Sequence, residues 1–110
     1  MANINIEEVA KQMIEAAKDV FNKKWPEVKK YAESESKKFA ANMKEIALWK
    51  ANNEITEDEA KSLVGLHKRS MKMVFTSLEG ISLAMTEKAI NAALDVIRQT
   101  VNTAIGIAVL

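Results

Sequence analysis

Apolar side chains recur at helical spacing along most of the chain. In the N-terminal half they form rows of residues eleven positions apart: Ile6, Ala17, Val28 and Phe39; Ala10, Phe21, Ala32 and Met43; and Val9, Val20 and Tyr31. Eleven residues make about three turns at ~3.67 residues per turn, so each row follows one face of a nearly straight helix. The pattern predicts a first helix from about residue 6 to about residue 52.

The C-terminal half repeats this spacing. Leu63, Val74, Met85 and Val96 lie eleven positions apart, and so do His67, Leu78 and Ala89. These rows predict a second helix over about 57–105, and Gly106 marks its end because glycine is the usual residue after a helix C-terminus. Residues 106–110 then form an apolar tail whose conformation the pattern does not predict.

Between the two halves lies a clear turn over residues 53–56. Asn52 and Asn53 suit a helix C-terminus because asparagine tolerates the left-handed backbone conformation. Thr56 and Glu59 have the spacing of a capping box, in which each side chain accepts a hydrogen bond from the other residue's backbone N–H. At the start of the chain, Asn5 is the corresponding cap before Ile6.

Pro26 and Gly80 interrupt the two helical patterns. Proline removes a helical hydrogen bond, and an interior glycine costs roughly 1 kcal/mol relative to alanine. The apolar rows nevertheless keep their phase across both residues, which favours a kink at Pro26 and a continuous helix through Gly80. The predicted fold is therefore all-α, a single helical domain over residues 1–110. Its helices form a long antiparallel two-helix hairpin that assembles into a helical bundle. The alternative is a monomeric four-helix up-down bundle, broken at Pro26, Asn53 and Gly80.

The predicted second helix carries two apolar stripes. One stripe spans the whole helix, and the other lies on nearly the opposite side of its C-terminal half. This second stripe holds Leu83, Ile90, Leu94, Ile97, Val101 and Ile105. The first helix has a single broad stripe and can cover only one of the two, so a hairpin leaves these six side chains in water. Exposed apolar patches of that extent usually mark an interface. The six residues are our sequence-based candidates for a self-association surface.

Composition narrows the function classes further. Sixteen basic and fifteen acidic residues leave a net charge of +1, without the basic excess typical of nucleic-acid binding. The chain has no cysteine, and its first residues lack the pattern of a signal peptide. Asp95 and Arg98 interrupt the most apolar segment, where a membrane span tolerates charge poorly. We therefore expect a soluble, cytoplasmic protein.

Candidate chemistry is sparse. His67 and Met71 lie four residues apart on one helical face, a geometry that can reach a metal or haem, but both lie on the predicted core stripe. No phosphate-binding loop, nucleophile elbow or zinc motif is present. We expect no enzymatic activity, no cofactor, no metal and no small-molecule substrate. A small-ligand pocket lined by Phe21, Met71 and Met85 is a third possibility, which ranks below the two functions given next.

These observations predict a non-enzymatic structural or protein-interaction module that forms a homo-oligomer, a dimer or larger, through the second stripe. The alternative is reversible binding to a membrane or another hydrophobic surface through the C-terminal amphipathic helix. No nucleic-acid partner is expected. A small-angle scattering profile separates the two folds, since a long hairpin extends to about 70 Å.

Overall fold

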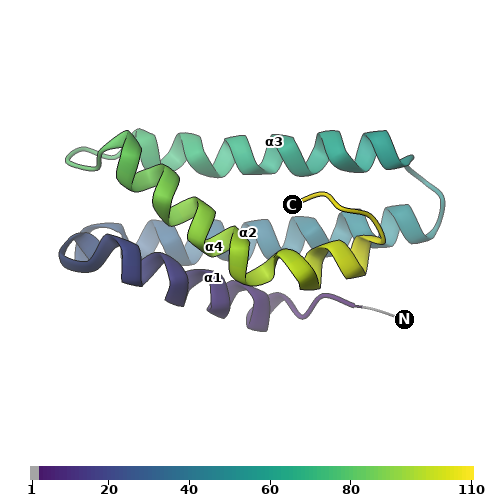
Figure 1. Cartoon of the computed structure of the whole chain (residues 1–110), viewed down its shortest axis with the longest axis horizontal. Helices are drawn as coiled ribbons and strands as arrows, with labels where there is room; N and C mark the ends of the chain where they lie inside the picture. The colour runs from purple at the N-terminus through teal and green to yellow at the C-terminus, as the bar shows by residue number, and fades with distance from the viewer. Residues whose placement is uncertain (1–2) are drawn as a thin grey trace.

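The structure is a computed structural model that describes residues 3–110. These residues form four α-helices and one short 3-10 turn: α1 (Ile6–Phe21), η1 (Asn22–Lys24), α2 (Trp25–Ala51), α3 (Glu57–Thr76) and α4 (Leu83–Ile105). Successive helices run in opposite directions, which makes an up-down bundle (Figure 1). The predicted all-α helical bundle is confirmed, in the four-helix arrangement that the sequence leaves as the alternative.

The dimensions of the molecule exclude the long hairpin. Its longest extent is 43 Å and its radius of gyration is 13.8 Å, whereas an unbroken helix of the predicted length extends to about 70 Å. The longest helix is α2, with 27 residues. At ~1.5 Å per residue, α2 alone runs the full length of the bundle.

The first correction concerns Pro26, where the sequence predicts a kink and the chain makes a turn. Asn22 adopts φ 49° and ends α1, after which η1 reverses the chain. Pro26 then lies in the first turn of α2, where a helix needs no N–H from it. The apolar rows keep their phase because the stripes of α1 and α2 both face the same core.

The second correction concerns Gly80, where the predicted continuous helix is broken into α3 and α4. Gly80 adopts φ 81°, a backbone conformation that residues other than glycine rarely adopt. Ser82 then caps α4 by accepting a 3.1 Å hydrogen bond from the backbone N–H of Met85. The chain therefore reverses over residues 77–82, and α4 runs back along the bundle.

The other predicted helix ends are confirmed. The side chain of Asn5 accepts a hydrogen bond from the backbone N–H of Glu8 at 3.0 Å. Both hydrogen bonds of the capping box between Thr56 and Glu59 form, at 2.9 and 3.1 Å. Gly106 ends α4 in the left-handed conformation, with φ 90°.

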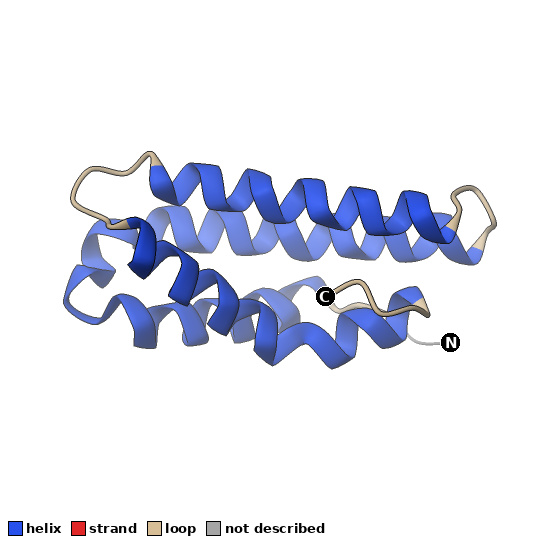
Figure 2. Cartoon of the chain, turned by 45° about the horizontal axis from the view of Figure 1, so that its top comes forward, coloured by secondary structure: helices blue, strands red, loops and turns tan. Residues whose placement is uncertain are grey.

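The helices pack around a continuous apolar core. α1 lies between α2 and α4 and shares its most extensive contacts with α4. The backbone of α3 lies close to α2 and α4 only, and α3 reaches α1 through the ring of Phe75, which stacks on Phe21. α4 begins beside the C-terminal end of α3 and diverges from it toward its own C-terminus (Figures 1 and 2). An ion pair of 2.9 Å between Lys72 and Glu87 joins the two helices where they are close.

The C-terminal tail folds back between the diverging α3 and α4 (Figure 1). Ile107, Val109 and Leu110 are partly buried against the core. The side chain of Asn102 fixes this return, because its Oδ1 accepts hydrogen bonds from the backbone N–H groups of Val109, at 2.9 Å, and Leu110, at 3.0 Å. One asparagine thus holds the tail against the bundle.

We predict that Asn102→Ala releases the tail and lowers the free energy of unfolding by about 1–2 kcal/mol, because two hydrogen bonds are lost. Urea denaturation measures the loss, and hydrogen exchange measures the opening at the amides of Val109 and Leu110. Gln99→Ala, a substitution of an exposed residue on the same helix, is the control. Unchanged exchange at both amides in Asn102→Ala contradicts the role of this side chain.

Candidate functional site

The six residues predicted as an association surface occupy two different environments. Leu83, at the start of α4, is 56 % exposed. The other five lie in the core, and Ile97 and Val101 are fully buried. The second stripe therefore forms part of the interior of a single protomer, and only Leu83 remains available on its surface.

This finding corrects the reasoning behind the predicted surface. The sequence argument assumes one long helix covered by one neighbour. In the structure the break at η1 turns the first half of the chain into α1 and α2, and both of these helices pack against α4. These two helices together cover the second stripe, whereas Val96 on the other stripe is 50 % exposed. Self-association itself stays a prediction, but its surface must lie elsewhere.

The most exposed apolar side chains on a single helix face lie on α3. Met73 is 71 % exposed and Leu66 is 52 % exposed. They belong to a series with alternating steps of three and four residues, which we call the outer face of α3: Leu63, Leu66, Ser70 and Met73 of the helix and its C-cap Ser77. Leu63, at one end of the series, is partly buried against the core. This is the spacing of a coiled-coil seam. None of the five carries a charge, and two are small serines.

A group of polar side chains lies between α2 and α3, which we call the α2–α3 polar cluster: Glu35, Lys38, Asn42, His67 and Ser70. They line a cavity of about 220 Å³ together with Phe39 and Met71. Glu35 is buried and pairs with the ammonium of Lys38 at 3.1 Å. The amide nitrogen of Asn42 lies 3.1 Å from Nδ1 of His67. Helical spacing relates His67 only to residues of its own helix, so the sequence does not reveal these groups on α2.

Burial lowers the pKa of His67 below its ordinary value, and this effect is larger than the opposing attraction of Glu45. The positive charge of Lys38 lowers the pKa further. With a neutral ring, Nδ1 can accept a hydrogen bond from the amide of Asn42. In a protonated ring Nδ1 carries a hydrogen and would face the amide N–H of Asn42. The Asn42 amide would then have to rotate by half a turn so that its oxygen accepts the hydrogen bond. The cluster thus favours a neutral histidine.

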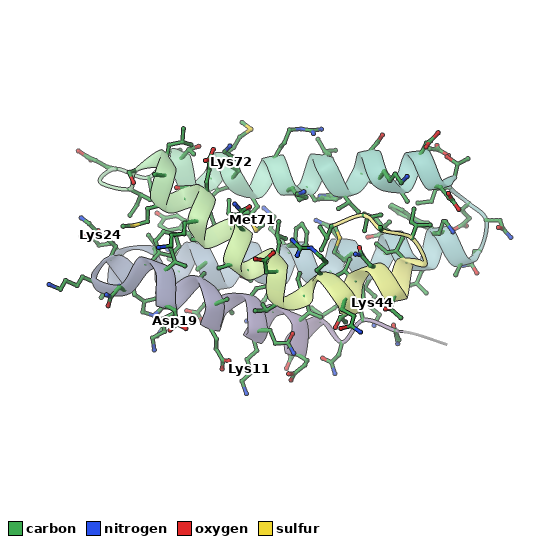
Figure 3. All side chains as sticks on the ribbon, viewed as in Figure 1. Lys11, Asp19, Lys24, Lys44, Met71 and Lys72 are labelled. Carbon is green, nitrogen blue, oxygen red and sulfur yellow. The ribbon has the colours of Figure 1, made fainter. Side chains whose placement is uncertain are left out.

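The lower-ranked possibility from the sequence, a pocket lined by Phe21, Met71 and Met85, is filled by side chains. The rings of Phe21 and Phe75 stack with their centroids 5.7 Å apart. A cavity of only about 10 Å³ lies beside Phe21 and Met71, which is about the space of one water molecule. Met71 is buried and points into the bundle (Figure 3). These residues form core, as the helical spacing of the methionines predicts.

Among residues 3–110, no helix is both long enough and apolar enough to cross a membrane. Comparison of the chain with protein-family models, with curated proteins and with solved structures finds no match.

We predict that Ile97→Ala lowers the free energy of unfolding by about 2–5 kcal/mol, because it leaves a cavity in the core. Val96→Ala is the matched control, since Val96 is the neighbouring residue and is 50 % exposed. Its effect stays within about 0.5 kcal/mol. Urea denaturation checks both values. Equal, small effects of the two substitutions would contradict the burial of the second stripe.

The lowered pKa of His67 also predicts a pH dependence. The folded state binds its proton less readily than the unfolded state, in which the pKa is about 6.5. Stability contributed by the neutral ring is therefore complete above that value and declines as the pH falls toward the folded pKa. We expect the wild type to lose more stability than His67→Gln between pH 7.5 and pH 5, as measured by urea denaturation. An equal loss in both proteins would show that the imidazole is not the cause.

Proposed function

We propose that this chain is a non-enzymatic interaction module that self-associates through the outer face of α3. The observation that carries the proposal is the exposure of Leu66 and Met73 in an uncharged series with coiled-coil spacing. α3 is also a peripheral helix of the bundle, since its backbone lies close to α2 and α4 only. Its outer side is therefore free to meet another helix.

A second copy of α3 fits this face when it runs in the opposite direction. If the two-fold axis passes near Lys68, Leu63 of one copy lies opposite Met73 of the other, and Leu66 lies opposite Ser70. Each large side chain thus meets a smaller or flexible one, as helix packing requires. A two-fold dimer uses the same patch on both protomers, so one face is sufficient to build it.

The size of the face predicts a weak complex. From Leu63 to Ser77 the helix advances about 21 Å, and a single pair of such helices covers less than the ~800 Å² per partner of a standard interface. We therefore expect a dimer whose population rises with protein concentration.

The alternative from the sequence, reversible binding to a hydrophobic surface through the C-terminal helix, stays a prediction. It requires α4 to separate from α1, with which α4 shares the most extensive contacts in the bundle. Exposure of the outer face of α3 requires no such separation, and for that reason we place self-association first.

Sedimentation velocity over a wide concentration range tests the proposal. We expect the average mass of the wild type to rise with concentration and that of Leu66→Glu/Met73→Glu to stay at one protomer. Leu48→Glu is the matched control, because Leu48 on α2 is 53 % exposed and Leu66 is 52 % exposed. This control should behave as the wild type. A wild type that stays monomeric throughout, or a dimer that survives the double substitution, would overturn the proposal.

A further inference from the structure

The side of α3 that faces α4 carries a different kind of surface, a basic wall. Lys68, Arg69 and Lys72 of α3 line a cavity of about 270 Å³, together with Glu87, Asn91 and two apolar residues of α4. We call it the α3–α4 cavity. Lys72 is engaged by Glu87 at 2.9 Å. Within residues 3–110, no carboxylate lies close enough to Lys68 or Arg69 to form an ion pair.

The floor of the cavity is apolar. Ile90 and Leu94 of α4 line it and are otherwise buried in the core. Lys72 lies at the end of the cavity where α3 and α4 are close together (Figure 3). The cavity therefore offers cationic groups on one wall and aliphatic side chains at its base, and its single carboxylate is already paired with Lys72.

Gly65 provides a second, independent observation. A glycine inside a helix costs roughly 0.5–1 kcal/mol relative to alanine, and Gly65 is not a residue with a positive φ. A Cβ at this position would lie 3.3 Å from Nη1 of Arg69. The guanidinium of Arg69 therefore lies over Gly65, one turn earlier in α3. The absence of a side chain at Gly65 leaves room for it there.

The C-terminal tail shows what kind of chain the neighbouring space accepts. Beyond the cavity, where α3 and α4 diverge, the C-terminal segment Ile107–Leu110 runs between them (Figure 1). Apolar side chains thus fill the space beyond the cavity, and the basic wall gives the cavity itself a preference for negative charge.

We propose that the α3–α4 cavity binds a free single-chain amphiphile with an anionic head, a medium- or long-chain carboxylate. Lys68 and Arg69 hold the carboxylate, since a guanidinium can bind both of its oxygens at once. The first part of the alkyl chain packs on Ile90 and Leu94. The volume of 270 Å³ lies just below the ~300–1,000 Å³ of drug-sized sites, so the cavity holds the head group and the adjoining part of the chain. This site is separate from the outer face of α3.

Titration calorimetry with dodecanoate below its micelle concentration tests the proposal. We expect binding of one molecule per protomer, and at least a tenfold loss of affinity in Lys68→Gln/Arg69→Gln. Lys61→Gln is the control for charge, because it removes one positive charge from an exposed position of α3 that does not line the cavity. Its affinity should equal that of the wild type. Dodecanol, which lacks the charge, and acetate, which lacks the chain, should each bind at least tenfold more weakly than dodecanoate.

A second variant keeps the test independent of folding. Gly65→Ala should raise the thermal midpoint, because alanine favours the helix, and should weaken dodecanoate binding, because it displaces Arg69. Equal affinity for dodecanol and dodecanoate, or an unchanged affinity in Lys68→Gln/Arg69→Gln, would overturn the proposal. So would association only with vesicles of an anionic phospholipid and not with the free carboxylate.

Discussion

The constraint on which the rest of this structure depends is the broad apolar face of α4. Its buried side chains include Ile90, Leu94, Ile97 and Val101, which cover a wide arc of the helix. A helix of this kind is stable in water only when neighbours cover that whole face. The chain meets this requirement by turning at η1, which converts the first half into two helices that both reach α4. α3 is left at the periphery, and its free surfaces follow from that position.

Local signals predict the class of the fold and several of its boundaries. Asn5, the Thr56–Glu59 pair and Gly106 act on backbone groups within a few residues, so their sequence spacing is sufficient to identify helix ends. The breaks at Asn22 and Gly80 depend on a positive φ at a single residue and on long-range packing. The continuous phase of the apolar rows conceals them, because antiparallel helices around one core keep the same periodicity. Ser82 caps the start of α4 and is present in the sequence, but the pattern of apolar residues does not reveal it.

The candidate sites were less accessible from the sequence than the fold. The exposure of Leu66 and Met73 depends on which side of α3 meets α2, and a helical wheel does not supply that information. The environment of His67 comes from Asn42 and Glu45 on another helix, 25 and 22 positions away in the sequence. The cavity between α3 and α4 exists because the two helices diverge. The basic residues Lys68, Arg69 and Lys72 are close together in the sequence, but only the crossing of α4 gives them an apolar floor.

The pairing of α1 with α4 has a consequence for biosynthesis. These two helices lie near opposite ends of the chain, yet they share the most extensive contacts in the bundle. During translation α1 and α2 emerge first and can form their local hairpin, whereas the flank of α1 that receives α4 stays uncovered until residues 83–105 leave the ribosome. Incomplete chains released before that point expose an apolar surface on α1. Chaperones recognise surfaces of this kind, and such surfaces lead to aggregation.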